Sequence, residues 1–264
     1  TRLPNKCTAL YIAAQHGRAE VVGQLATHGA NIENSDGRGW TPLMTASCRG
    51  RAEAIEELLK LGASIDKQQE DRETALYVAS QRGHLDCVRV LLNRGAALEI
   101  PDVKSWTPLM ASIYGKRTSA MALLLEKGAD MVTALPNQAT APYLTCDAGA
   151  LEMGRLLLDH GANIEAVDFE RWTSLMSTAQ YGQLEVARVL IKNGANVNAS
   201  NKEGVTPMAV ASVNKHSHVA SMLRSHGGRP RPAAVVMMMR SRHLVLCSKA
   251  SRSIQKYHCY LITA

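Results

Sequence analysis

A chain of 264 residues can form one large domain, two ordinary domains or a repeat array, and a content of 46% hydrophobic and 20% charged residues is typical of a folded protein. Aromatic residues make up only 4%, so the core must consist mainly of aliphatic side chains and methionine. No apolar run approaches the ~18 residues that a membrane-spanning helix requires, and we therefore expect no membrane span.

The net charge of +7 is concentrated at the C-terminal end of the sequence. All 23 acidic residues precede residue 229, whereas residues 229–264 contain seven of the 30 Lys and Arg residues. Residues 1–228 are therefore neutral overall and carry no general signature of polyanion binding. We predict that residues 229–264 form a basic, disordered tail. The alternative is that this tail has a binding function and contacts nucleic acid or an acidic surface.

The six cysteines show no C-x-x-C pair and no spacing typical of a disulfide framework. They are Cys7, Cys48, Cys87, Cys146, Cys247 and Cys259. Reduced thiols are the simplest interpretation, and they are typical of the cytosol and the nucleus. We therefore expect a cytoplasmic location, with the nucleus as the alternative.

Threonine recurs every 33 residues through most of the chain. A glycine followed by a small residue comes at a constant spacing after each of these threonines, as in Gly29-Ala30. The repeat threonines are Thr8, Thr41, Thr74, Thr107, Thr140, Thr173 and Thr206. Two markers that stay in register over seven copies indicate an internal repeat over residues 1–228.

Each copy of the repeat predicts two short helices. The threonine is a good N-cap, and in three copies proline follows at the first helical position, where its missing N–H costs nothing. The first helix should end near a glycine such as Gly50. The second helix carries apolar residues at helical spacing, such as Val88 and Leu91, and should end at the Gly-small pair. Because such a pair cannot bury its apolar face alone, we expect seven pairs to stack on one another.

This unit resembles the ankyrin repeat, which has the same length and the signature T-P-L-H-x-A. The most similar copies are residues 41–46, which read TPLMTA, and residues 107–112, which read TPLMAS. The resemblance covers roughly residues 4–228 and implies an all-α solenoid of helix-turn-helix units with short β-hairpin fingers. It also implies that another protein binds on the concave face. The signature histidine is absent from every copy, so the hydrogen bond that it makes to threonine in the family cannot form.

A weaker period of two copies is superimposed on the repeat. Copies 2, 4 and 6 have Trp before the threonine and Met at the histidine position, whereas copies 1, 3 and 5 have Tyr at that position. In copy 5, Pro142 replaces the leucine that other copies usually bury, and Gly154 replaces an apolar residue of the second helix. We therefore predict that copy 5 is the least stable unit and opens before copies 3 and 6.

The three Trp residues and the only Phe lie in the segments that the resemblance implies to be fingers. Trp40, Trp106 and Trp172 each precede a repeat threonine directly, and Phe169 lies four residues before Thr173. The resemblance implies that this position, and the positions seven and eight residues after the threonine, line the concave face. The further candidates for partner contact are Arg38, Lys104, Arg49, Arg82, Tyr114 and Tyr181. Trp, Tyr and Arg dominate binding hot spots. The alternative is that each Trp packs against the stem of its own finger.

No motif of a known class of enzyme is present: the sequence contains no P-loop, no G-x-S-x-G, no H-E-x-x-H and no kinase signature. We predict no catalytic residue, metal site or cofactor, and expect His216 and His218 to be solvated. The function predicted is that of a monomeric, non-enzymatic scaffold that binds a protein partner. One alternative is the substrate-recognition arm of a larger enzyme or signalling protein with a catalytic domain upstream of Thr1. A second is nucleic-acid binding through the tail.

Overall fold

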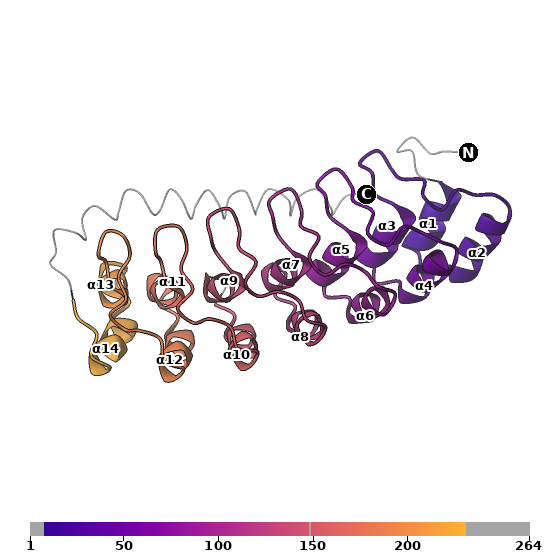
Figure 1. Ribbon diagram of the computed structural model, residues 1–264. Coiled ribbons are helices and arrows are strands. Elements are labelled where there is room, and N and C mark those ends of the chain that lie inside the picture. Colours follow the sequence, from indigo (N-terminus) through magenta and orange to yellow (C-terminus); the bar gives the residue numbers. More distant parts are fainter. Residues whose placement is uncertain (1–7, 148, 231–264) are drawn as a thin grey trace. The chain divides into compact units, whose positions relative to one another are not determined.

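The computed structural model describes residues 8–147 and 149–230 (Figure 1). Residues 231–264, which make up nearly all of the predicted tail, lie outside the described residues, as do residues 1–7 and 148. The chain divides into two compact units. Unit 1 ends at Phe169, and unit 2 begins at Glu170.

The described residues form 14 helices and no β-strand, which confirms the prediction of an all-α fold. Unit 1 contains α1 (Ala9–Gln15), α2 (Ala19–Thr27), α3 (Pro42–Cys48), α4 (Ala52–Lys60), α5 (Ala75–Arg82), α6 (Leu85–Asn93), α7 (Pro108–Tyr114), α8 (Thr118–Glu126), α9 (Ala141–Asp147) and α10 (Leu151–Asp159). Unit 2 contains α11 (Ser174–Tyr181), α12 (Leu184–Lys192), α13 (Pro207–Val213) and α14 (Ser217–Ser225). Consecutive helices form pairs, each with an odd-numbered first helix and an even-numbered second helix. A loop, called a finger below, precedes each first helix.

The repeat threonines begin the first helices. In six of them, Oγ1 of the threonine accepts the N–H of the residue three positions later at 3.2–3.4 Å. This bond satisfies one of the donors that a helix N-terminus leaves unpaired. Thr140, before α9, is the exception: its Oγ1 is buried and has no hydrogen-bond partner among the described residues. The N-terminus of α9 therefore lacks the bond that the other first helices share.

The Gly-small pairs end the second helices in one geometry. After α2, Gly29 has φ 84°, and its N–H donates to the carbonyl of Ala26 at 2.9 Å. The N–H of Ala30 donates to the carbonyl of Leu25, also at 2.9 Å. These two bonds form a Schellman motif, which needs a left-handed residue that glycine adopts without strain. A glycine with positive φ stands at the same place after the other second helices, at Gly62, Gly95, Gly128, Gly161, Gly194 and Gly227.

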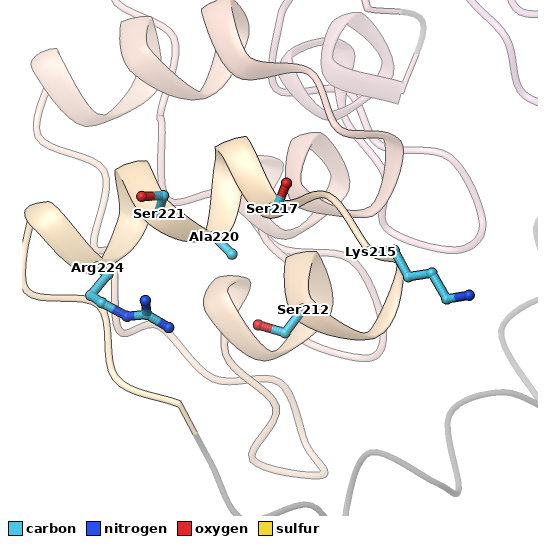
Figure 2. A pocket seen from close by; sticks show the side chains of 6 residues that line it. All are labelled: Ser212, Lys215, Ser217, Ala220, Ser221 and Arg224. Atoms are coloured by element: carbon cyan, nitrogen blue, oxygen red, sulfur yellow. The ribbon is translucent and has the colours of Figure 1, made fainter.

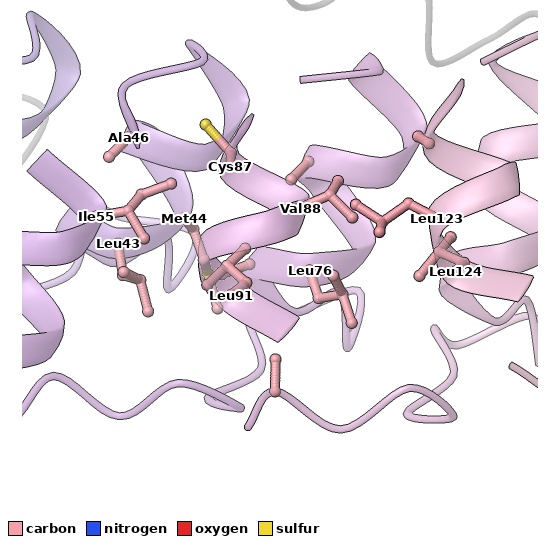
Figure 3. Packing of buried hydrophobic residues seen from close by; sticks show 14 of the residues in the cluster. Leu43, Met44, Ala46, Ile55, Leu76, Cys87, Val88, Leu91, Leu123 and Leu124 are labelled. Atoms are coloured by element: carbon pink, nitrogen blue, oxygen red, sulfur yellow. The ribbon is translucent and has the colours of Figure 1, made fainter. Parts of the chain in front are cut away.

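Aliphatic side chains fill the core of unit 1. Leu76 of α5 and Val88 and Leu91 of α6 are completely buried. Ile55 and Leu124, from the pairs before and after, belong to the same cluster (Figure 3). First helices pack against neighbouring first helices, and second helices against second helices. Each fully buried side chain of this size contributes ~1.5–3 kcal/mol, so the pairs are held together mainly by this shared apolar layer.

The fingers before α3 and α7 are closed turns rather than the paired strands that we expected. In the finger before α3, the N–H of Asp36 donates to the carbonyl of Trp40 at 3.0 Å, and Asp102 and Trp106 form the same bond before α7. The aspartate side chain accepts hydrogen bonds from further N–H groups of the turn. Aspartate favours such local turns because its carboxylate competes for backbone donors that a strand pair would need.

Gly154 leaves unused space in the second helix of copy 5. Other second helices of unit 1 bury Ile55, Val88 or Met121 at this position. A Cβ atom at Gly154 would meet Thr145 Oγ1 at 3.7 Å as its nearest neighbour, which is ordinary van der Waals contact. We expect Gly154→Ala to raise the free energy of unfolding by ~1 kcal/mol, because alanine favours a helix over glycine by that amount. Thermal or urea unfolding measures it.

Gly83→Ala is the matched control for that substitution. Gly83 has φ 78°, and a Cβ there would lie 2.5 Å from Cδ of Arg117, so this variant should be destabilised. A Gly154→Ala chain that is less stable than the wild type would contradict the assignment of free space in α10.

Candidate functional site

The residues directly before the repeat threonines lie in a row beside the first helices, called the finger row below. In unit 1 the finger row consists of Trp40, Glu73, Trp106 and Ala139. Trp40 and Trp106 both pack against a small cluster formed by buried side chains of α5 and α7. The finger row and the first helices of unit 1 therefore share one surface.

Asp102 holds the finger that carries Trp106. Its Oδ1 accepts the N–H of Lys104 at 2.7 Å and the N–H of Trp106 at 2.9 Å. Its Oδ2 accepts a hydrogen bond from the Tyr77 hydroxyl at 3.0 Å. Burial, with a further contribution from nearby Asp102, raises the pKa of Tyr77, so this hydroxyl stays protonated and donates. The three bonds fix the backbone at Trp106 against α5.

Asp36 repeats this arrangement two copies earlier. Its Oδ1 accepts the N–H of Arg38 at 2.8 Å and that of Trp40 at 3.0 Å, and the Tyr11 hydroxyl lies 3.5 Å from its Oδ2. Unlike Asp102, which is 8% exposed, Asp36 is only half-buried. The Trp40 finger therefore has the same anchor in a weaker form.

These anchors explain the period of two copies. In both cases the aspartate follows a tyrosine at the same spacing and directly precedes the turn that leads to a tryptophan. The sequence has the same spacing a third time, at Tyr143, Asp168 and Trp172. Where methionine replaces tyrosine, the aspartate is also replaced; Met110, for example, packs with Leu135 in an apolar cluster. Tyrosine thus provides a hydroxyl donor at the position that the family signature gives to histidine.

Trp106 is the most central aromatic side chain of the finger row. Its ring lies edge-on to that of Tyr114, with centroids 5.8 Å apart and an interplanar angle of 78°. This geometry is favourable for an aromatic pair. Trp106 also packs against the clusters that contain Tyr77 and Met110, yet it remains half-buried. Its ring is therefore held in place by these neighbours, and the residue is not fully buried.

The structure places the other predicted contact residues unequally. Arg38 and Arg49 are exposed, whereas Lys104, Arg82 and Tyr114 are half-buried. The exposed fraction is 59% for Phe169, in unit 1, and 40% for Tyr181, in unit 2. Trp172 is a correction to our expectation of a partly exposed ring: it is 1% exposed and cannot contact a partner in this structure. The Trp172 ring is thus one of the largest fully buried side chains among the described residues and part of the core.

Glu73 is a residue of the finger row that the sequence analysis did not single out. It occupies the tryptophan position of its copy and is half-buried, and Gln69 Nε2 donates to its Oε2 at 2.8 Å. Burial raises the pKa of Glu73 from 4.5 to about 7, and Asp71 and Asp102 add to the shift against the opposing effects of Gln69 and Arg82. The sequence signal that could have indicated Glu73 is a glutamate at the position where both neighbouring copies have tryptophan.

The raised pKa of Glu73 predicts a pH dependence of stability. The folded chain keeps the Glu73 proton up to about pH 7, whereas the unfolded chain releases it near 4.5. The folded chain therefore binds more protons in this window, and its stability falls as pH rises from 4.5 through 7. We expect Glu73→Gln to be more stable than the wild type at pH 8. This difference should shrink toward pH 5; thermal unfolding at both values measures it, and a difference that grows toward pH 5 would contradict it.

Two histidines contact helix C-termini. Nε2 of His84 donates to the carbonyl of Cys48 at 2.9 Å, and Nε2 of His216 donates to the carbonyl of Gln180 at 3.0 Å. His216, which we expected to be solvated, is thus half-buried and bonded. Its signal in the sequence was its position, ten residues after the repeat threonine, which copies 1 to 4 fill with arginine or histidine.

A cavity of about 370 Å³ lies between α13 and α14 of unit 2 (Figure 2). It is lined by Ser212, Lys215, Ser217, Ala220, Ser221 and Arg224. The ammonium group of Lys215 points away from the other lining side chains (Figure 2). Exposed serine residues and the exposed Arg224 thus line this cavity.

Within residues 8–147 and 149–230, no group of three or more His, Cys, Asp or Glu side chains is placed to hold a metal ion. In the same part of the chain, none of the helices has the length and hydrophobicity needed to span a bilayer.

Comparison with known families matches the family described as ankyrin repeats (3 copies), at residues 1–69, 61–134 and 146–232. The chain belongs to the ankyrin repeat family. No curated protein matches the sequence significantly. Among solved structures, the ankyrin repeat domain of Bcl-3, a unique member of the IκB protein family, is 27% identical with a TM-score of 0.75. That match covers 83% of this chain and 99% of the Bcl-3 domain.

The human ASB11 ankyrin repeat domain is also similar, at 25% identity and a TM-score of 0.76. The match covers 85% of this chain and all 100% of the ASB11 domain. These similarities agree with the helix pairs and fingers of both units, and the ankyrin repeat is a fold whose general use is protein interaction.

Proposed function

We propose that this ankyrin repeat chain is a non-catalytic protein-binding module whose partner binds the concave face, formed by the fingers and first helices. The observation that carries this proposal is the state of Trp106. Its backbone is fixed by Asp102, its ring is supported by Tyr114, and the residue is only half-buried. A rigid aromatic side chain offers a large contact area and loses little conformational entropy when a partner binds.

The charged residues around Trp106 support the same surface. Lys104 lies on the same finger, and Arg38 lies at the equivalent place on the finger of Trp40. Arg49 follows α3 and is exposed. Arginine and lysine around an aromatic centre resemble the usual anatomy of an interface, in which an apolar centre is enclosed by a polar rim. Trp106, Tyr114, Trp40 and these basic side chains form the surface that we propose for the partner.

The free cysteines support a reducing compartment, and we propose the cytoplasm. Cys48 and Cys87 are free thiols. Burial raises the pKa of Cys87 to about 12, so this thiol stays protonated and poorly reactive at neutral pH.

Affinity purification with the full chain as bait tests the binding proposal. Quantitative mass spectrometry would compare the wild type with Trp106→Ala and with Arg89→Ala, in which an exposed arginine of the second helix α6 is removed. We expect a specific set of proteins to be retained by the wild type and by Arg89→Ala and to be depleted by Trp106→Ala. Depletion by Arg89→Ala alone would assign the partner to the second helices and contradict the proposal.

A further inference from the structure

Three kinds of polar link join consecutive helix pairs of unit 1. The first joins neighbouring fingers through the backbone. The N–H of Glu70 donates to the carbonyl of Arg38 at 3.3 Å, and the N–H of Val103 donates to that of Asp71 at 2.9 Å. In each case the donor lies one position short of a full repeat after the acceptor. The third member of this series would require the N–H of residue 136 and the carbonyl of Lys104.

The second kind of link satisfies the C-terminus of a first helix. Nε of Arg51 lies 3.5 Å from the carbonyl of Gln15, Nε2 of His84 lies 2.9 Å from that of Cys48, and Nε of Arg117 lies 3.3 Å from that of Gln81. The donor lies three positions beyond a full repeat from the acceptor each time. A cation at a helix C-terminus also complements the helix dipole. The next member of this series would join residue 150 to Tyr114.

The third kind of link joins the loops that follow the second helices. Oε1 of Glu33 accepts the N–H of Ser64 at 2.7 Å, and Oδ1 of Asp66 accepts that of Ala97 at 3.0 Å. Oε1 of Glu99 accepts the N–H of Asp130 at 2.8 Å. Here the donor lies two positions short of a full repeat after the acceptor. The next member of this series would join residue 132 to the N–H of Asn163.

All three series are interrupted around the α9–α10 pair. Residue 136 is Pro136, which has no N–H to donate; residue 150 is Ala150, which has no side-chain donor. Residue 132 is Val132, which has no side-chain acceptor and is 77% exposed. The uncapped N-terminus of α9 adds a fourth defect. The α9–α10 pair thus keeps its apolar packing and, in the bond from Phe169 N–H to the Asn137 carbonyl, one link of the first kind to the following finger. It lacks one link of each kind to the α7–α8 pair.

In the second series, the residue that donates the bond lies against a glycine of the preceding copy, so the change to Ala150 goes with a change at that glycine position. Gly17, Gly50 and Gly83 lie under the arginine or histidine of the next copy, and a Cβ at Gly83 would be 2.5 Å from Arg117 Cδ. In the copy before Ala150, the glycine position is occupied by Lys116, which keeps the left-handed backbone with φ 56°. A Cβ is tolerated there because Ala150 is small. Lys116 and Ala150 therefore replace the glycine and the arginine or histidine of the earlier copies, and this replacement lacks the side-chain hydrogen bond between the two copies.

We propose that the α9–α10 pair opens locally as a unit while the preceding helix pairs of unit 1 stay folded. Repeat arrays are stabilised by nearest-neighbour interfaces, so a pair with fewer links to its neighbours has the lowest opening free energy. The pair is a joint built into the fold, at which unit 1 opens without global unfolding. This joint is independent of where a partner binds.

Hydrogen exchange with mass spectrometry on the full chain under native conditions tests the joint. Amides of α9 and α10 should exchange roughly tenfold or more faster than those of α5 and α6. The reason is that the α9–α10 pair lacks several of the hydrogen bonds that hold the α5–α6 pair. Equal protection of the two pairs would overturn the proposal.

Restoring and removing links gives matched variants. Lys116→Gly combined with Ala150→Arg recreates the second kind of link, and Val132→Glu recreates the third. Each should slow exchange of α9–α10 by roughly fivefold, the change in an equilibrium constant that one net hydrogen bond typically produces. The matched losses are Arg117→Ala and Glu99→Val, which should speed exchange in the α7–α8 pair.

Val132→Glu changes an exposed side chain and keeps the test available if the double variant fails to fold. Restored links that leave the exchange of α9–α10 unchanged, while the matched losses speed that of α7–α8, would overturn the proposal.

Discussion

Replacing Trp106 with alanine is expected to weaken partner binding by at least ~2 kcal/mol, which is about a 30-fold rise in Kd. The ring lies near the middle of the described finger row and is supported by Tyr114, so the contact area that it offers is already ordered before binding. Titration calorimetry of the wild type and the variant against the captured partner measures this effect.

The same variant also tests the alternative role of Trp106 as support for its own finger. Because the ring is half-buried, truncation should cost less than the ~3–5 kcal/mol typical of a fully buried tryptophan. A large loss of stability with unchanged affinity would assign Trp106 to the finger stem and retire its binding role. Arg89→Ala is the control for surface changes outside the finger row, and neither its stability nor its affinity should move by more than ~0.5 kcal/mol.

Asp102→Ala should lower the free energy of unfolding by about 3 kcal/mol, the largest effect that we expect from a single polar substitution. The variant loses three hydrogen bonds to an ionised acceptor and leaves the Tyr77 hydroxyl buried without that partner. The Trp106 finger should also loosen, since its backbone anchor is gone. Urea unfolding gives the stability, and tryptophan fluorescence reports the environment of the ring.

Asp36→Ala is the matched control, because Asp36 has the same set of partners. Its bond to Tyr11 is 3.5 Å long, and the carboxylate is half-buried, so we expect a loss of only about 1 kcal/mol. Equal losses in the two variants would show that burial does not set the strength of these anchors.

The local helix signals were sufficient to predict the helix pairs. Six of the seven repeat threonines place an oxygen where a helix N-terminus needs an acceptor, and each Gly-small pair provides the left-handed residue that ends the second helix. These effects depend on residues within one turn, so they can be derived from the sequence. The prediction that copy 5 is the least stable unit rests on Pro142 and Gly154 alone. The missing links at Val132 and Ala150 needed the structure, because the partners in these series lie in the neighbouring copy.

The state of each candidate site residue could not be predicted in the same way. Trp106 and Trp172 occupy the same position in their copies, yet one is half-buried and the other is 1% exposed. The difference depends on neighbouring copies, which a repeat alignment treats as equal. The raised pKa of Glu73 likewise results from burial and from acidic neighbours such as Asp102.

Site-specific photo-crosslinking tests the binding proposal most directly. A photoreactive amino acid would replace Arg49, which is exposed after the first helix α3, or Arg89, which is exposed on the second helix α6. Both variants would be full chains, irradiated with the same partner. Binding on the concave face predicts a strong covalent adduct from position 49 and little or none from position 89. An adduct from position 89 without one from position 49 would contradict the assignment of the partner to the fingers and first helices.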